Sequence, residues 1–388
     1  MRASRAATAD EHYMRRALSL AKRGRGRTHP NPMVGAVVVR GGRVVGEGWH
    51  RRAGGPHAEV IALTRAGRRA RGATLYVTLE PCSHYGRTPP CVESVIASGV
   101  RRVVVAVRDP NPRVRGRGVR ALSRAGVAAE VGRLAGEARA LNAGYFKFHA
   151  EGLPWVRLKL AASLDGKIAP RSRRGWLTGP EAVRAAHALR AAHDAVVIGG
   201  GTARQDDPRL TVRAARGDDP LRVVVSASLR FASRARLFRD PLAPGTVVGT
   251  ASPGSGTASW RSRREKLEAR GVRVWTLGKG GRVPLAALLR RLAAEGAQHV
   301  LVEGGAELAG RLLAERLVDE LALFTAPLVL GEGVDWARGA SFETRTAPRL
   351  REARWERYGR DWLVTGRLDY GVHGNRRRGG KGSRRARA

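Results

Sequence analysis

The feature that most constrains this chain is a set of reactive side chains in three short segments near its N-terminus. One segment holds His57 and Glu59 with a single alanine between them, and the other two are Pro-Cys pairs that end at Cys82 and Cys91. The chain of 388 residues has no other cysteine. We expect the segments to begin helices, whose first turns project side chains outward and whose positive dipole ends favour thiolate. The fold must therefore bring one imidazole and two thiols together.

These side chains predict a metal site. One His and two Cys supply three of the four tetrahedral positions of zinc and leave the fourth for a water, whose pKa zinc lowers to about 7. Glu59 lies two residues beyond the ligand His57, so it can act as general acid and base beside the metal without binding it. The pattern resembles the signature of zinc nucleobase deaminases, although the spacer between Cys82 and Cys91 is much longer than the two residues of that signature.

Apolar runs and helix-like patterns alternate along most of the chain, which indicates an α/β protein. The first series has helices at 11–22, 58–70, 92–98 and 134–149, and strands at 34–39, 43–48, 73–79 and 102–107, with a hairpin at Gly41-Gly42. The second series has helices at 180–192, 284–295 and 306–315, and strands at 155–162, 195–199, 221–226, 246–249, 272–277, 299–303, 320–326 and 362–368. We therefore expect two domains, 1–149 and 150–370, and a basic, disordered tail at 371–388.

The charge and composition set limits on location and partners. The net charge of +39 is typical of nucleic-acid binding, but arginine, alanine, glycine and valine are all abundant, which also fits a general drift toward arginine at surface positions. No apolar stretch approaches the roughly 20 residues of a membrane span. The N-terminus has no secretory signal, so we expect a cytoplasmic protein. A reducing compartment disfavours a disulfide between the two cysteines and favours a metal site.

Four strings carry a closer resemblance: HPNPMVGAVVV, PHAEV, TLEPCSHYGRTPPC and DPNP, all within the first 150 residues. They resemble the deaminase half of the bifunctional riboflavin-biosynthesis deaminase/reductase family, in which the longer cysteine spacer is normal. The resemblance implies a phosphoribosylamino-pyrimidine substrate, one amine of which is hydrolysed to a carbonyl. It also implies substrate contacts from Asn31, His50, His84, Arg87 and Asn111.

The chemistry of these residues suits that substrate, but each also has a simpler interpretation. Asparagine offers a donor and an acceptor to a pyrimidine edge, and histidine and arginine suit a phosphate. Position 87 is often lysine in the family, and Arg87 keeps the charge with a different geometry. Alternatively, Asn31 and Asn111 cap their own backbone in Asn-Pro turns, and His50 is a surface residue.

The second series resembles the reductase half of the same family, through LKLAASLDGK, WLTG, GGGTARQDDPRL and VEGG. That half is similar to dihydrofolate reductase, so the fold class is a cytidine-deaminase-like three-layer domain followed by a dihydrofolate-reductase-like α/β domain. The resemblance implies NADPH as hydride donor. It places the cofactor near Ala162, Trp176, Thr202, Asp206, Gly304, Gly305, Ala306, Glu307 and Leu308. It places the sugar phosphate near Arg190, Leu210 and Arg213, with Glu303 also at the substrate.

The residues alone say less about this half. The glycine-rich junctions at 199–202 and 304–305 either receive a phosphate at a helix N-terminus or are tight packing turns, and neither is GxGxxG. Lys159 and Asp165 are polar residues within or just after an apolar strand, so they either polarise the reacting sugar or form a structural ion pair. The segment 169–175, APRSRRG, departs from the family pattern, so its arginines either grip phosphate or belong to an altered cofactor loop.

Three functions remain open from the sequence. The first is a bifunctional enzyme of riboflavin biosynthesis that deaminates and then reduces a small phosphorylated pyrimidine, acting as a homo-oligomer with zinc and NADPH. The second is an RNA base deaminase that grips nucleic acid with its basic tail, which leaves the second domain unexplained. The third is a second domain that binds a nucleotide as a regulator without reducing anything.

Overall fold

The computed structural model describes residues 2–85, 89–172, 175–232, 234–253 and 257–371. The chain divides into two compact units, and we describe each by itself. The first unit comprises Met1–Trp155, Ala192–Asp194 and Leu289–His299, and the second comprises Val156–Ala191, Ala195–Leu288 and Val300–Ala388. No helix among the described residues is both long and apolar enough to cross a membrane.

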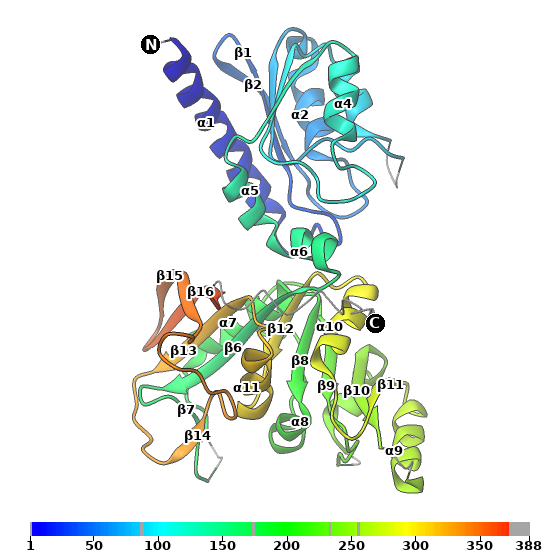
Figure 1. Cartoon of the computed structure of the whole chain (residues 1–388), viewed down its shortest axis with the longest axis vertical. Coiled ribbons are helices and arrows are strands. Elements are labelled where there is room, and N and C mark those ends of the chain that lie inside the picture. The colour runs from blue at the N-terminus through cyan, green and yellow to red at the C-terminus, as the bar shows by residue number, and fades with distance from the viewer. Residues whose placement is uncertain (1, 86–88, 173–174, 233, 254–256, 372–388) are drawn as a thin grey trace, which may run out of the picture. The chain divides into compact units, whose positions relative to one another are not determined.

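The first unit is built on a five-stranded sheet with the order β2-β1-β3-β4-β5 (Figure 1). Its strands are β1 (Gly35–Arg40), β2 (Arg43–Trp49), β3 (Thr74–Val77), β4 (Arg102–Val105) and β5 (Ala128–Val131). Strand β1 runs antiparallel to both β2 and β3, whereas β3, β4 and β5 are parallel to one another. The predicted hairpin of β1 and β2 is therefore confirmed.

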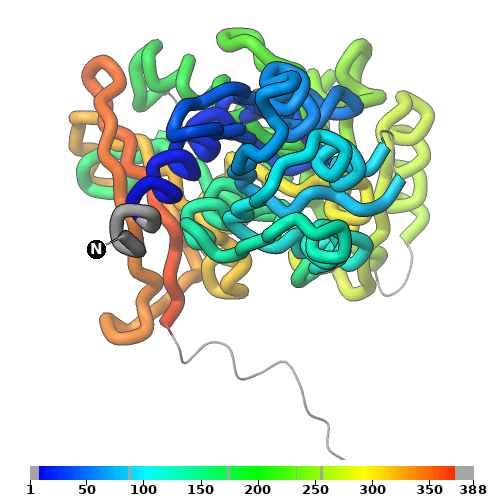
Figure 2. Tube along the Cα trace, turned by 90° about the horizontal axis from the view of Figure 1, so that it is seen from above, coloured from blue at the N-terminus to red at the C-terminus, as the bar shows by residue number. Residues whose placement is uncertain are grey.

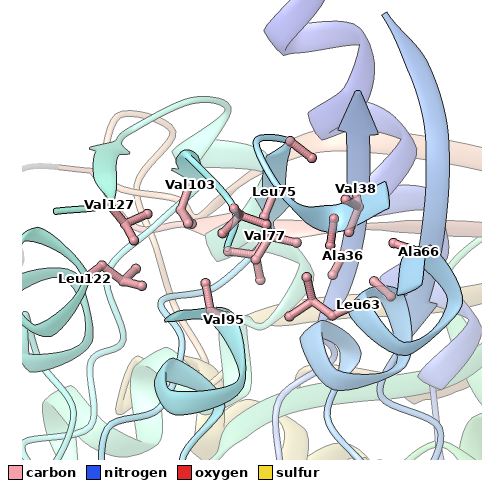
Figure 3. Close-up of a cluster of buried hydrophobic side chains, with 14 of the residues drawn as sticks. Ala36, Val38, Leu63, Ala66, Leu75, Val77, Val95, Val103, Leu122 and Val127 are labelled. Carbon is pink, nitrogen blue, oxygen red and sulfur yellow. The ribbon is translucent and has the colours of Figure 1, made fainter. Parts of the chain in front are cut away.

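Helices cover both faces of this sheet and complete three layers. Alternate residues of β1 point to opposite faces, so Val38 joins one core cluster and Val37 joins the other. The first cluster, shown in Figure 3, also contains Leu63, Val95 and Leu122, which lie on three different helices. These helices are α2 (Ala58–Ala66), α3 (Cys91–Ala97) and α4 (Arg117–Arg124), and the opposite face carries α1 (Arg2–Ala21), α5 (Ala135–Leu141) and α6 (Ala143–Glu151).

The first unit differs from the sequence-based expectation at several places. The single helix expected over 134–149 is two helices, because the Asn142 side chain between them bonds the backbone of Met33 instead of pointing to solvent. Helix α4 and strand β5 were not predicted. Cys82 does not begin a helix, since it lies in the loop between β3 and α3, and only Cys91 is the first residue of a helix.

The second unit is built on a nine-stranded sheet with the order β11-β10-β9-β8-β12-β6-β13-β16-β15. Neighbouring strands pair in parallel from β11 to β12 and between β6 and β13, and β16 and β15 then pair antiparallel, as the orange to red hairpin at one edge in Figure 2 shows. The strands are β6 (Trp155–Ser163), β8 (Ala195–Gly199), β9 (Leu221–Val225), β10 (Thr246–Ser252), β11 (Arg273–Lys279), β12 (His299–Glu303), β13 (Glu320–Ala326), β15 (Arg349–Tyr358) and β16 (Asp361–Asp369).

The helices of this part of the chain are α7 (Pro180–Ala191), α8 (Gly200–Asp206), α9 (Ala258–Glu268), α10 (Leu285–Ala294) and α11 (Ala306–Ala314), and β7 (Lys167–Pro170) pairs with β14 (Gly333–Asp335) in a small separate sheet. Helices α8 and α9 and strands β7, β14 and β15 were not predicted. Strand β15 is exposed along almost its whole length, so its sequence lacks the alternation of apolar and polar residues that marks a half-buried strand. The basic tail, apart from Gly371, lies outside the described residues.

Candidate metal centre and substrate sites

The topology of the first sheet gathers the predicted deaminase residues at one edge. Cys82 follows the carboxyl end of β3 and Asn111 follows that of β4, and these strands are parallel neighbours. His50 follows the carboxyl end of β2, and Asn31 precedes the amino end of β1. Because β1 runs antiparallel to both β2 and β3, all four residues meet at the same edge of the sheet.

The three predicted metal ligands meet at this edge. Their ligand atoms all lie within 4.8 Å of one another. His57 Nδ1 is 2.8 Å from Cys91 Sγ and 3.6 Å from Cys82 Sγ. His57 is the N-cap residue of α2, and Cys91 is the first residue of α3, as its proline neighbour and position in the sequence predict.

Cys82 is the more acidic of the two cysteines. Hydrogen bonds from the Cys91 thiol and from His57 lower the pKa of Cys82 to about 4, against the opposing effect of burial. The same thiolate raises the pKa of Cys91. The Cys91 amide also donates to Cys82 Sγ over 3.2 Å. Two sulfurs and one imidazole nitrogen at this spacing fit a zinc ion, for which this donor set is typical.

Glu59 lies in the first turn of α2, directly beside the three ligand atoms. Its residue surface is only 3% exposed, and burial raises its pKa to about 7, against the opposing effect of His57. Its side chain is close enough to Cys91 to share a hydrogen bond. A carboxyl group with a pKa near neutrality is suited to accept a proton and to return it.

A cavity of about 410 Å³ opens onto these residues. Its walls include His57, Cys82 and Glu59, together with predicted substrate residues of this half. Those residues are Asn31, His50, His84 and Asn111. Arg87 lies outside the described residues. The structure therefore joins two of the predicted metal ligands, the carboxyl group and four of the predicted contacts in one cavity, with Cys91 directly behind them.

His50 and Asn31 orient each other in this cavity. His50 is 2% exposed, so the interpretation of it as a surface residue is wrong. Its Nδ1 lies 3.1 Å from the Pro56 carbonyl oxygen, and its Nε2 lies 3.1 Å from Asn31 Nδ2. Burial lowers the pKa of His50, so the neutral ring donates from Nδ1 and accepts the Asn31 amide at Nε2.

The two asparagines therefore differ. Asn111 Oδ1 accepts the backbone amide of Arg113 over 3.0 Å, which is the local cap expected of an Asn-Pro turn. The Asn31 side chain pairs with His50 in place of its own backbone. Both side chains also have a tertiary partner at the cavity, which is His50 for Asn31 and the Tyr145 hydroxyl for Asn111.

Three buried polar residues that the sequence did not single out support this cavity. Asn142 donates to and accepts from the backbone of Met33 over 2.9 and 2.8 Å, which fixes the loop that carries Asn31. Asp109 Oδ1 accepts the Tyr145 hydroxyl over 2.9 Å, and burial raises the pKa of Asp109 to about 6. Glu80 bonds the backbone after β4. Two of them could have been predicted from the sequence, because Glu80 and Asp109 are acidic residues that each closely follow an apolar strand.

The second unit brings three of its predicted cofactor residues, Thr202, Gly304 and Gly305, together where the strand order reverses. Strands β8 to β11 follow one another outward, and the chain then returns to place β12 on the other side of β8. Because β8 and β12 are parallel, Thr202 after β8 and Gly304-Gly305 after β12 lie at the same edge. A Cβ on Gly305 would come within 3.0 Å of Thr202 Oγ1, so the two junctions touch. Ligands of open α/β sheets bind at such a reversal.

The N-cap residue of α11, Gly305, has no side chain that could cap the first amides of the helix. Such amides suit the phosphates of a dinucleotide, which fits the predicted NADPH. Ala306 and Leu308 are buried in this helix, and Glu307 is exposed. The other predicted cofactor residues are dispersed: Ala162 is buried on β6, Asp206 is exposed at the end of α8, and Trp176 is 82% exposed.

A charged cluster lies at the carboxyl end of β12. The Arg190 guanidinium donates to both carboxylate oxygens of Glu303 over 2.5 and 2.9 Å, and Lys159 Nζ lies 3.8 Å from Glu303 Oε2. Burial raises the pKa of Glu303, but Lys159 and Arg190 outweigh it and bring the pKa to about 2. The Glu303 side chain is 11% exposed, so this carboxylate is a fixed charge between two cations.

Helix α7 fixes the loop that holds the other two predicted phosphate residues. Arg190 donates to the Thr211 carbonyl oxygen over 3.1 Å, and the Arg213 amide donates to His187 Nδ1 over 3.3 Å. Leu210 is buried and has a φ of +56°, a left-handed conformation that is strained for leucine and recurs at functional sites. His187 was not predicted, because no motif of the sequence includes it.

Lys159 and Asp165 do not form a pair with each other. Lys159 is half-buried beside Glu303, whereas Asp165 is exposed. Asp165 accepts the Ser163 hydroxyl over 2.6 Å and the amides of Leu330 and Gly331 over 3.1 and 2.8 Å, and these bonds lower its pKa to about 2. The structural ion pair of this region therefore joins Lys159 to Glu303, and Asp165 organises a loop.

The departing segment 169–175 begins at the end of β7, which pairs with β14. Arg171 forms an exposed ion pair with Glu332 over 2.8 Å. Residues 173 and 174 lie outside the described part of the chain.

Comparison with known proteins assigns both units. The family model "RibD C-terminal domain" matches residues 154–364, and the model "Cytidine and deoxycytidylate deaminase zinc-binding region" matches residues 7–107. The riboflavin biosynthesis protein RibD of Aquifex aeolicus is 41% identical over 357 residues, which cover 92% of this chain and 97% of that protein. The chain belongs to the RibD family. The Escherichia coli member is 43% identical and covers 83% of this chain and 89% of its own length.

Solved structures agree with the family. Acinetobacter baumannii RibD has a TM-score of 0.81 at 37% identity and covers 94% of this chain and 99% of its own. The diaminohydroxyphosphoribosylaminopyrimidine deaminase/5-amino-6-(5-phosphoribosylamino)uracil reductase of Thermotoga maritima has a TM-score of 0.79 at 33% identity, with the same coverage of 94% and 99%.

These findings confirm the expected fold class, a cytidine-deaminase-like domain followed by a dihydrofolate-reductase-like domain. The chain is a bifunctional deaminase/reductase of riboflavin biosynthesis, with a zinc-binding deaminase domain and an NADPH-using reductase domain. Because the family accounts for the second domain as well, an RNA base deaminase is not favoured.

Proposed function

We propose that His57, Cys82 and Cys91 hold the zinc ion and that Glu59 transfers the protons of the deamination. The observation that carries this proposal is the meeting of the three ligand atoms within 4.8 Å, with the buried Glu59 beside them in the wall of one cavity. Zinc held there would supply a water whose pKa is lowered to about 7. The roles proposed for the other residues of this cavity follow from their positions relative to the metal ligands.

Glu59 accepts a proton from the attacking water and delivers it to the leaving amine. Water adds to the ring carbon that carries the exocyclic amine, and the carbon–nitrogen bond then breaks, so the products are a ring carbonyl and ammonia. The pKa of about 7 allows Glu59 to do both steps near neutral pH. The substrate proposed is 2,5-diamino-6-(5-phosphoribosylamino)pyrimidin-4-one.

Asn31 and His50 bind and orient the pyrimidine in this proposal. The His50 ring takes one N–H of the Asn31 amide, which leaves the Asn31 oxygen and its second N–H for the edge of the base. His84, Asn111 and Arg87 complete the substrate contacts. Arg87, like the lysine often found at this position in the family, supplies a positive charge for the phosphate.

In the second unit we propose that the edge formed by Thr202 and the start of α11 holds NADPH. The residues assigned to the cofactor are Ala162, Trp176, Thr202, Asp206, Gly304, Gly305, Ala306, Glu307 and Leu308. NADPH supplies the hydride that converts the ribosyl group to ribityl. Arg190, Leu210 and Arg213 bind the sugar phosphate, and Glu303 contacts the substrate beside them. Lys159 and Asp165 polarise the reacting sugar.

We further propose the domain limits 1–149, 150–370 and 371–388, a homo-oligomeric state, and a place in the cytoplasm. Two free thiols at a metal site favour a reducing compartment. Gel filtration with light scattering tests the oligomeric state.

A two-stage assay tests the function. The purified zinc enzyme is mixed with the pyrimidine first without NADPH and then with it. We expect one equivalent of ammonia in the first stage, and NADPH oxidation with a ribityl product only in the second. Absence of the ribityl product would reduce the second unit to a nucleotide-binding regulator, and absence of ammonia would refute the deaminase assignment.

A further inference from the structure

Glu80 is a buried carboxylate to which neither half of the reaction gives a task. It follows β3, two residues before Cys82, and is only 3% exposed. Oε2 accepts the backbone amides of Asp109 over 3.2 Å and Gly116 over 2.9 Å, and Oε1 accepts that of Val119 over 3.1 Å. A buried carboxylate is costly unless it is hydrogen-bonded, and these amides stabilise its charge.

Two of these amides belong to the start of helix α4. Gly116 is its N-cap residue, with a φ of +77°, and it has no side chain to cap the helix. Val119 lies in the first turn, which contains no acidic residue. The first amides of a helix need an acceptor, and the positive end of its dipole favours an anion. Glu80 supplies both from a distant part of the sequence.

The third amide connects Glu80 to the substrate side of the cavity. It belongs to Asp109, whose Oδ1 accepts the amide of Asn111 over 2.8 Å. The same segment packs directly on the Cys82 loop, since a Cβ on Gly118 would lie 2.1 Å from the Pro81 carbonyl oxygen. Glu80 therefore ties the loop of a metal ligand to the loop of a predicted substrate contact.

We propose that Glu80 is a positioning residue of the deaminase site, which sets the place of Asn111 relative to the metal ligand Cys82. Glu80 also lines the cavity, but both of its oxygens accept backbone amides of the 109–119 segment, so it acts on the pyrimidine through that segment. This inference rests on the proposed function of the cavity. According to this inference, the Glu80 carboxylate affects how tightly the pyrimidine binds, and it affects neither the chemical step nor the binding of zinc.

The test is Glu80→Gln in the full-length zinc enzyme. The amide turns an N–H toward backbone N–H groups, so bonds are lost with little change in size. We expect KM for the pyrimidine to rise about tenfold, which corresponds to about 1.4 kcal/mol, with kcat within twofold and zinc content unchanged. Amide exchange at Asp109, Gly116 and Val119 should accelerate. Glu80→Asp, which keeps the charge, should give a smaller rise in KM.

Three comparisons keep the test decisive. The matched control Glu130→Gln removes an exposed carboxylate of the same unit and should leave KM unchanged. Circular dichroism of the full chain reports whether the variant is folded, and the reductase activity, assayed with the deaminated intermediate, reports that the second unit is unaffected. If Glu80→Gln does not fold, Gly118→Ala takes its place, because the added methyl group must push α4 away from Pro81 and raise KM in the same way.

An unchanged KM in the folded Glu80→Gln variant would overturn the positioning role, and so would loss of zinc in parallel with activity. A wild-type enzyme that releases no ammonia would instead refute the proposed function of the cavity.

Discussion

The two units of the chain use a largely buried glutamate in opposite ways. Glu59 faces two cysteine sulfurs and one imidazole, and burial raises its pKa to about 7. Glu303 lies between Lys159 and Arg190, and these cations bring its pKa to about 2 in spite of burial. In our proposal the same residue type is thus a proton carrier in one site and a permanent anion in the other.

The difference lies in the charged side chains that neighbouring helices and strands place beside each carboxylate. Burial alone favours the neutral acid, and nearby cations reverse that preference. The N-terminal turn of α2 gives Glu59 no lysine or arginine partner among the described contacts, whereas β6 and α7 each bring a cation to Glu303. A buried acid therefore has to be interpreted with its partners, which come from distant parts of the chain.

The largest effect is expected from Glu59→Gln. The amide cannot carry the proton, so deamination should fall by about 10³- to 10⁴-fold while zinc content stays the same. The matched control is Glu93→Gln, since Glu93 lies two residues after the ligand Cys91 as Glu59 does after His57, but is exposed and bonded to Tyr85. Ammonia release and metal analysis check both variants. Full deamination in Glu59→Gln would contradict the mechanism.

A smaller effect is expected from Glu303→Gln. The change leaves Arg190 and Lys159 without their anion, so we expect about a 100-fold loss of kcat/KM for reduction and about 3 kcal/mol of stability. NADPH oxidation and urea unfolding measure these quantities, and deamination should persist in the folded variant. The control Glu320→Gln breaks the pair with Arg157 at the start of β13, so it should lower stability without raising the reductase KM.

The pH dependence should separate the two carboxylates. As pH falls from 8 to 6 through the raised pKa of Glu59, the ionised base becomes scarcer, so kcat/KM for deamination should fall about tenfold. Glu303, with its pKa lowered to about 2, stays ionised over this range, so its ionisation should cause no fall in kcat/KM for reduction. Separate assays of the two steps in one buffer series check this. If kcat/KM depended on pH in the same way for both reactions, the fall in deamination would not be due to Glu59.

The smallest effect is expected from deletion of residues 375–388. The pyrimidine is a small molecule, so removal of the basic tail should leave both activities within twofold of the intact chain. The assay with free pyrimidine and an RNA-binding measurement at two salt concentrations test this. Loss of deamination on truncation would return support to the RNA deaminase hypothesis.

The sequence by itself determined the metal centre and the order of the two domains. The pattern is chemically specific: it combines His57 and Glu59 in one short segment with Cys82 and Cys91 in another. Each segment can be recognised without knowledge of the fold. Most of the predicted helices and strands formed because their apolar periodicity matches the faces that are buried, as Val37 and Val38 of β1 illustrate. Exposed β15 carried no such periodicity and was missed.

Only the tertiary structure decided which polar residues are fixed and by what. Asn31 and Asn111 stand in similar Asn-Pro turns, yet only Asn31 meets a histidine from the end of another strand. Lys159 pairs with Glu303 rather than with the nearby Asp165 for the same reason. The charge state and task of such groups depend on partners that lie far away in sequence, because strand pairing and helix packing bring them together. Local pattern determines which chemistry is possible, and packing determines which carboxylate carries a proton and which keeps its charge.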